Sequence, residues 1–130
     1  MVKKKEEKNL SELALKAMKN SHSPHSKFKV GAALEGKSGK VYLGANIEFD
    51  AYTLTVCAER AALFNAVSNG EKNFKSLVIA TSSKEFKFPC GLCRQALIEF
   101  NPNLNITLLT RDGRSKSFIL KDILPNYFKL

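Results

Sequence analysis

Apolar residues recur along this chain at two periods, that of a helix and that of a strand. Apolar residues at helical spacing predict an amphipathic helix over residues 9–19, namely Leu10, Leu13, Ala14, Ala17 and Met18. Short apolar runs predict strands at residues 28–34, 40–47, 77–81, 106–110 and 116–120. The turn Gly36-Lys37-Ser38-Gly39 joins the first two runs, which therefore predict a hairpin.

Helices are also predicted in the middle and at the end of the chain. Residues 57–68 are rich in alanine, and Thr55 is a candidate cap for this helix. Pro89 is expected to start another helix that continues to Phe100, because proline is favoured in the first turn. Asp122 is a candidate cap for a short terminal helix. Residues 48–56 show no regular pattern.

The order of these elements predicts the fold class. The middle of the chain reads strand–helix–strand–helix–strand, which implies right-handed crossovers and parallel neighbouring strands. The opening hairpin adds an antiparallel edge. We therefore expect a three-layer α/β/α sandwich with a mixed sheet of about five strands. A length of 130 residues suits one domain over residues 1–130.

Composition and charge exclude several classes of protein. No apolar run approaches the roughly 20 residues of a membrane span, and the charged N-terminus lacks the apolar region of a secretory signal. The net charge is +9, but the lysines are scattered and form no arginine-rich stripe, so no specific nucleic-acid partner is expected. The chain has only three cysteines, and this small, odd number argues against a secreted disulfide framework. Two of them form a Cys-x-x-Cys motif, which favours a metal site in a reducing, cytoplasmic environment.

All three cysteines lie in two short motifs, Cys57-Ala58-Glu59 and Pro89-Cys90-Gly91-Leu92-Cys93. Three thiolates can hold a zinc ion and leave its fourth position open, whereas a structural zinc site needs a fourth protein ligand. A glutamate two residues after the first cysteine can carry protons at that position. Together the motifs match the three-cysteine form of the zinc deaminase signature, in which the glutamate is the general acid/base.

Both motifs begin predicted helices, and the positive end of a helix dipole favours thiolate over thiol. Arg60 and Arg94 each follow a cysteine closely, so we expect them to hydrogen-bond sulfur and to offset the negative charge of a zinc ion with three thiolates. The alternative for both arginines is a surface salt bridge.

Glu59 is expected to take a proton from water at the metal and to return protons to the ring nitrogen and the leaving ammonia of an aminated aromatic ring. The alternative for Glu59 is an exposed helix glutamate. A Cys-x-x-Cys motif can also be redox-active, but that interpretation leaves Cys57 unexplained.

Five segments of the chain resemble the small homotetrameric zinc-dependent cytidine deaminases, and the likeness covers nearly the whole length. The segments are Phe28–Leu34, Gly44–Glu48, Cys57–Arg60, Pro89–Gln95 and Ile123–Phe128. The resemblance implies one zinc ion per chain, held by Cys57, Cys90 and Cys93, and a homotetramer with shared active sites.

The resemblance also implies roles in substrate binding. Asn46 and Glu48 would hydrogen-bond the ribose, Phe28 would pack against the base, and the backbone around Ala58 would read the pyrimidine edge together with Glu59. In a neighbouring subunit's site, Phe128 would stack on the base and Tyr52 would reach the ribose. Each residue has a plainer alternative: Phe28 as core, Asn46 to Glu48 as a turn that ends the hairpin, and Phe128 as an anchor of the terminal helix.

Two short stretches depart from the family pattern. His22 and His25 stand in the loop where the family usually has tyrosines. After Glu48 this chain has Phe49-Asp50, where the family tends to have Asn-Ala. These positions lie near the sugar, so the departures leave deamination intact and leave the preference between sugars open. The histidines are expected to make loop or subunit contacts.

The sequence therefore predicts hydrolytic deamination of cytidine and deoxycytidine to the uridine products, a reaction of pyrimidine salvage. One alternative is a deaminase of a modified cytosine nucleoside, such as a blasticidin-type antibiotic. Another is a non-catalytic, zinc-stabilised module that binds nucleic acid through its lysines. Glu59 favours both deaminase interpretations over the module, because a structural module has no use for an acid beside an open metal position.

Overall fold

The computed structural model describes residues 2–130, with side chains described from Asn9 onward. Within these residues the α helices are α1 (Val2–Met18), α2 (Ala58–Ser68) and α3 (Gly91–Ile98). The strands are β1 (Val30–Gly36), β2 (Val41–Ala45), β3 (Phe74–Thr81), β4 (Asn105–Leu109) and β5 (Ser115–Ile119). Two short 3₁₀ helices, η1 (Tyr52–Leu54) and η2 (Leu120–Ile123), complete the regular structure.

The strands form one mixed sheet in the order β2-β1-β3-β4-β5. β3 and β4 are parallel, with Leu77 opposite Ile106, and the other three pairings are antiparallel. The predicted hairpin is confirmed as β1 and β2. The parallel neighbours predicted from the chain order are found only for β3 and β4. β2 and β3 are not neighbours, because β1 lies between them and pairs with both.

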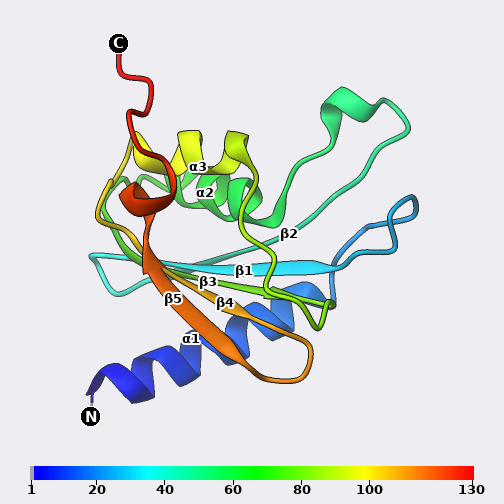
Figure 1. Ribbon diagram of the computed structural model, residues 1–130, viewed down its shortest axis with the longest axis horizontal. Coiled ribbons are helices and arrows are strands. Elements are labelled where there is room, and N and C mark those ends of the chain that lie inside the picture. The colour runs from blue at the N-terminus through cyan, green and yellow to red at the C-terminus, as the bar shows by residue number, and fades with distance from the viewer. Residues whose placement is uncertain (1) are drawn as a thin grey trace.

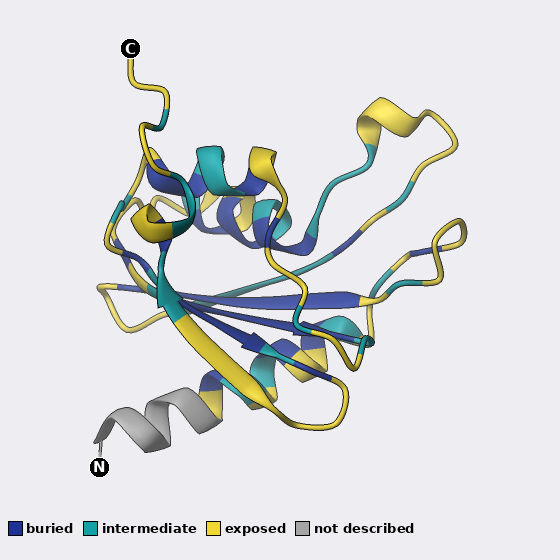
Figure 2. Ribbon diagram, in the orientation of Figure 1, coloured by how far each residue is buried: buried dark blue, intermediate teal, exposed yellow. Residues whose placement is uncertain are grey.

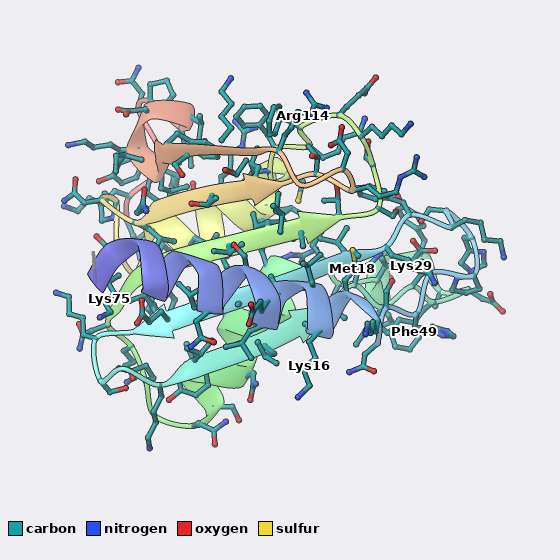
Figure 3. All side chains as sticks on the ribbon, turned by 90° about the horizontal axis from the view of Figure 1, so that it is seen from below. Lys16, Met18, Lys29, Phe49, Lys75 and Arg114 are labelled. Atoms are coloured by element: carbon teal, nitrogen blue, oxygen red, sulfur yellow. The ribbon has the colours of Figure 1, made fainter. Side chains whose placement is uncertain are left out.

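Helices cover both faces of the sheet, and this confirms the three-layer α/β/α sandwich. Figure 1 shows α2 and α3 on one face and α1 on the other, and Figure 3 shows α1 lying across the sheet. Alternate residues of each strand serve the two faces. Leu34, Leu77 and Ile79 belong to the core cluster that packs under α2 and α3, whereas Ala33 and Val78 pack with α1. The central strands are buried, and much of β5 is exposed at the edge (Figure 2).

Two glycines allow these helices to approach the sheet. A Cβ atom on Gly31 would lie 2.2 Å from the carbonyl oxygen of Ala14 in α1, and one on Gly44 would lie 2.3 Å from the backbone nitrogen of Ala62 in α2. Both contacts are with backbone atoms, which cannot move aside as a flexible side chain can. Gly44 therefore sets how closely α2, the helix that begins beside Cys57, lies on the sheet.

We predict that Gly44→Ala destabilises the protein by about 1–3 kcal/mol, the usual cost of overpacking a core. Urea unfolding would measure the change in the free energy of unfolding. Gly91→Ala is a matched control, because a Cβ atom there meets nothing within 4 Å. Equal stability of the Gly44→Ala and Gly91→Ala proteins would show that α2 is free to shift away from the sheet.

Three predicted helix starts are wrong in detail. Cys57, with an extended backbone, is the N-cap of α2, and Thr55 instead accepts a hydrogen bond from the backbone N–H of Phe49. Cys90 is also extended, so α3 begins at Gly91 and Pro89 lies outside the helix. Asp122 lies inside η2 and does not cap it, because the chain turns directly from β5 into η2 at Leu120.

Within the described residues, no helix combines the length and the apolar character that crossing a membrane requires.

Candidate active site

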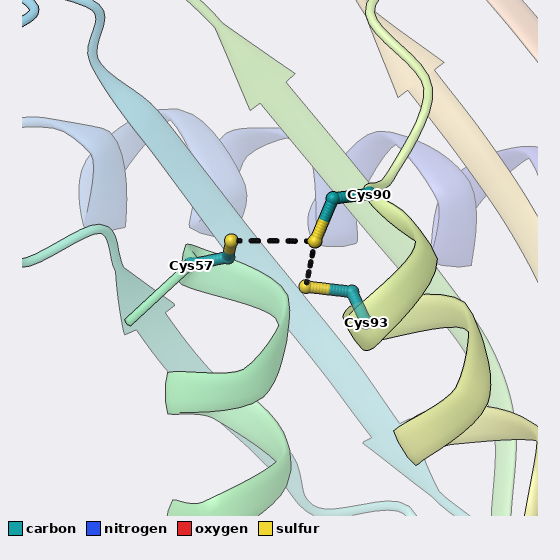
Figure 4. Close-up of side chains that lie close together, drawn as sticks. All are labelled: Cys57, Cys90 and Cys93. Carbon is teal, nitrogen blue, oxygen red and sulfur yellow. Dashed lines mark hydrogen bonds between the residues drawn. The ribbon is translucent and has the colours of Figure 1, made fainter. Parts of the chain in front are cut away.

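The three cysteine sulfurs converge where α2 and α3 begin. Cys57 and Cys90 are the N-caps of the two helices, and Cys93 lies in the first turn of α3 (Figure 4). The Sγ atom of Cys90 lies 3.7 Å from that of Cys57 and 3.4 Å from that of Cys93. Zinc–sulfur bonds of about 2.3 Å in a tetrahedron place sulfurs roughly 3.8 Å apart. The spacing and the thiol chemistry therefore fit a zinc ion held by three cysteines.

The environment of the sulfurs favours negative charge at Cys57. The adjacent Cys93 thiol stabilises a thiolate at Cys57 and lowers the pKa of Cys57 below its ordinary value, and the Arg60 guanidinium adds to this effect. The same interaction, together with burial, raises the pKa of the Cys93 thiol. Nη2 of Arg60 donates to the Cys57 sulfur at 3.6 Å, as the sequence predicted. The Nε atom of Arg60 is buried with no hydrogen-bond partner in the described part of the chain, so one donor of the guanidinium is unused.

Arg94 does not make the predicted hydrogen bond to sulfur. Its Nε donates to the carbonyl oxygen of Pro89 at 2.8 Å, and its Nη1 donates to the carbonyl oxygen of Ile123 at 2.7 Å. The side chain leaves the first turn of α3 toward the C-terminal segment, so it ties that segment to the residue before Cys90. Arg94 thus supports the backbone of a candidate ligand.

Glu59 lies in the first turn of α2, directly beside the sulfurs, and only 5% of it is exposed. Burial disfavours the charged carboxylate and raises the pKa of Glu59 to about 7, and the nearby Cys57 thiolate acts in the same direction. A carboxyl group with such a pKa can both take up and release a proton near neutral pH.

A cavity of about 280 Å³ opens beside Glu59, Cys57 and Cys90. Its walls combine apolar side chains, such as Phe28 and Ile79, with polar side chains from the surrounding loops. This combination of an apolar surface with a few convergent polar groups is typical of small-molecule sites. Of the residues singled out in the sequence, the cavity is lined by Phe28, Asn46, Glu48, Cys57, Ala58, Glu59 and Cys90.

Asn46 and Glu48 reach the cavity from the segment that follows β2, and both side chains already have protein partners. The Oδ1 atom of Asn46 accepts hydrogen bonds from Val30 N at 3.0 Å and from Ser21 Oγ at 2.5 Å, while Nδ2 donates to the Phe28 carbonyl oxygen at 2.8 Å. One N–H of Nδ2 therefore stays available to a ligand. Asn46 also has a structural role, because it joins the loop at Ser21 to the start of β1.

Tyr52 and Phe128 lie outside the cavity of their own chain. Tyr52 is 84% exposed on η1, and Phe128 is 67% exposed near the C-terminus, where its carbonyl oxygen accepts a hydrogen bond from Gln95. His22 and His25 lie outside the sulfur cluster. Sequence reasoning missed further residues that line the cavity, namely Ser26, Val30, Thr55, Val56, Thr81, Lys87 and Phe88. The one signal for Ser26 is its place just before the family-like segment that begins at Phe28.

A three-layer sandwich whose helix starts bring three cysteines and a buried glutamate together defines a zinc-binding deaminase. The chain belongs to the family of cytidine and deoxycytidylate deaminases, because the family model for their zinc-binding region matches residues 4–108.

Relatives in sequence and in structure agree with this assignment. The chain is 41% identical to a cytidine deaminase of Sporosarcina psychrophila over 87% of this chain and 84% of the relative. It is 39% identical to a cytidine deaminase of Halalkalibacterium halodurans over 88% of each chain. A cytidine deaminase structure from Burkholderia pseudomallei superposes with a TM-score of 0.89 at 38% identity, covering 92% of this chain and 97% of the other.

Proposed function

We propose that this protein catalyses the hydrolytic deamination of cytidine and deoxycytidine in pyrimidine salvage. The observation that carries this proposal is the position of Glu59, a buried proton carrier beside three cysteine sulfurs, at a cavity lined by Asn46 and Glu48. The names of the relatives, which are cytidine deaminases, support the same substrate class.

The residues of the site divide the work of the reaction. Cys57, Cys90 and Cys93 would hold a zinc ion, and such an ion would lower the pKa of water far enough to give a nucleophile near neutral pH. Glu59 accepts a proton and then delivers protons to the ring nitrogen and to the leaving ammonia. Phe28 packs against the base, and the backbone at Ala58 reads the pyrimidine edge. Arg60 offsets the negative charge of the thiolates.

An ultraviolet assay of cytidine loss, with zinc content measured on the same purified sample, tests the proposal. We expect conversion of cytidine and deoxycytidine by protein that contains close to one zinc ion per chain. Protein that is loaded with zinc and releases no ammonia from either nucleoside would contradict it. A gel shift that weakens with salt, in the absence of deamination, would favour the nucleic-acid module instead.

The positions of the lysines give no support to the nucleic-acid module. Figure 3 shows Lys16, Lys29 and Lys75 well apart and not in one stripe.

Removing Glu48 should weaken recognition of the sugar. We predict that Glu48→Ala raises KM for cytidine by about tenfold or more, because a hydrogen bond to a charged group contributes roughly 1.5–3 kcal/mol. Asn46→Ala should also raise KM and, in addition, lower stability, since it leaves Val30 N and Phe28 O without their partner. Steady-state kinetics and thermal unfolding measure the two effects. Unchanged KM in both variants would favour the modified-nucleoside alternative.

We further propose a cytoplasmic homotetramer in which neighbouring chains complete each site with Phe128 and Tyr52. The exposure of these two aromatic side chains supports the proposal, and closed symmetry would satisfy each exchange reciprocally. Large exposed apolar side chains also lie on the outer faces of α2 and α3, for example Phe64 and Leu92. A site that needs three free thiols suits a reducing compartment.

Sedimentation should show a tetramer, and mixed chains should test the sharing. We predict that Phe128→Ala raises KM and leaves the zinc content unchanged, because it removes a stacking surface and no ligand. When Phe128→Ala chains are mixed with inactive Glu59→Gln chains, some sites combine an intact Glu59 with an intact Phe128 and should regain affinity. A fully active monomer, or no recovery after verified subunit exchange, would contradict shared sites.

A further inference from the structure

The carboxylate of Glu48 is held by the loop between α1 and β1. Its Oε1 atom accepts hydrogen bonds from the backbone nitrogens of His25 and Ser26, both at 3.0 Å. Its Oε2 atom accepts a short hydrogen bond from the Ser26 hydroxyl. The loop therefore supplies three donors to one carboxylate. They hold the pKa of Glu48 below its ordinary value, and the Ser26 hydroxyl has the largest effect.

Ser26 also contacts the residue proposed to pack against the base. The backbone nitrogen of Phe28 donates to the Ser26 hydroxyl at 3.0 Å, so one side chain links Glu48 to the backbone of Phe28, and all three residues line the cavity. Lys27, between them, has a φ of 60°, a left-handed conformation that few non-glycine residues adopt. Such strain persists where surrounding contacts over-determine the backbone, and it clusters at ligand sites.

Two residues that depart from the family pattern meet at the same place. His25 Nε2 lies 3.1 Å from Asp50 Oδ1, which joins the loop before β1 to the segment after Glu48. The bridge between His22 and Ile47 joins the same two segments, and Figure 1 shows both loops at the same end of the sheet. The departures at positions 25 and 50 are thus one complementary pair beside Glu48.

We propose that Ser26 is a positioning residue for sugar recognition, which fixes the Glu48 carboxylate toward the ribose hydroxyls while it anchors Phe28. The inference rests on the proposed deamination of nucleosides. An untethered carboxylate would sample several rotamers, and binding the sugar would then cost the entropy of ordering it. With Ser26 and the loop in place, that ordering is complete before the substrate arrives.

A comparison of two substrates tests Ser26 in the zinc-loaded protein. Ser26→Ala should raise KM for cytidine by about tenfold, in line with one lost hydrogen bond to a charged group. KM for 2′,3′-dideoxycytidine, which lacks the ribose hydroxyls that Glu48 would bind, should rise much less. Any disturbance of Phe28 affects both substrates alike, so the difference between them isolates Glu48. Ser26→Thr keeps the hydroxyl and should recover most of the affinity for cytidine.

Ser38→Ala is a matched control, because the Ser38 hydroxyl also donates to a carboxylate, that of Glu71. Ser38 lies in the exposed turn between β1 and β2 and does not line the cavity. The substitution should leave both KM values unchanged. In a Glu48→Ala background, Ser26→Ala should have little further effect on cytidine, which makes the two substitutions strongly non-additive.

Three outcomes would overturn the assignment while leaving the proposed function intact, since the wild-type protein would still convert cytidine. The first is an equal rise in KM for both substrates, which would indicate general loop damage. The second is additive effects of Ser26→Ala and Glu48→Ala. The third is a rise in KM for cytidine that is larger for His25→Ala than for Ser26→Ala, because His25→Ala keeps every donor to Glu48 and removes only the pair with Asp50. Failure of the wild-type protein to convert either nucleoside would instead overturn the proposed function.

Discussion

Glu59→Gln should abolish nearly all activity while the protein keeps its zinc and its fold. The substitution preserves the shape of the side chain but removes the group that accepts and returns protons. General acid/base catalysis contributes about 10²–10⁴-fold, and a residue that serves several proton transfers should lie at the upper end or beyond. The kcat of the purified variant, with its zinc content measured alongside, checks this expectation.

Glu12→Gln provides the control for Glu59, because Glu12 is an exposed glutamate on α1, on the opposite face of the sheet from the cavity. It should keep wild-type kcat. A loss below about tenfold in Glu59→Gln would show that another group moves the protons.

Cys90→Ala should release the zinc ion and lower stability together. The sulfur of Cys90 lies within 3.7 Å of both other sulfurs, and its removal leaves only two thiol ligands. Metal-binding energy contributes to folding energy where the site forms only in the folded chain, so a fall of several kcal/mol in the free energy of unfolding is expected. Metal analysis and thermal unfolding, each with and without a chelator, measure the two effects.

Leu92→Ala is the matched control for Cys90, because Leu92 lies between the two ligands of α3 but is 68% exposed and offers no ligand atom. It should keep a full complement of zinc. A chelator should destabilise the wild-type protein and Leu92→Ala but leave Cys90→Ala nearly unchanged. Full zinc retention in Cys90→Ala would remove Cys90 from the set of ligands.

The sequence alone predicted the parts of this protein that depend on short spacing. Cys57 and Glu59 are two positions apart at a helix start, so a local rule brings the glutamate beside the first sulfur. Cys90 and Cys93 are the N-cap and a first-turn residue of one helix, so their short spacing brings their sulfurs together for the same reason. Short apolar runs predicted the strands, and the order of elements predicted the layers, because each face of a sheet must be covered. These patterns and the family resemblance together indicated the zinc chemistry.

Tertiary structure decided which distant segments meet. Chain order could not show that β1 lies between β2 and β3, because pairing partners compete across the whole sheet. Sequence spacing also could not predict the hydrogen-bond partners of Arg94, because its long side chain can adopt several rotamers. In the structure it donates to the carbonyl oxygens of Pro89 and Ile123. The contact of Ser26 with Glu48 joins two loops that are separate in sequence. Such contacts depend on how the loops pack at the end of the sheet, which no local pattern of residues encodes.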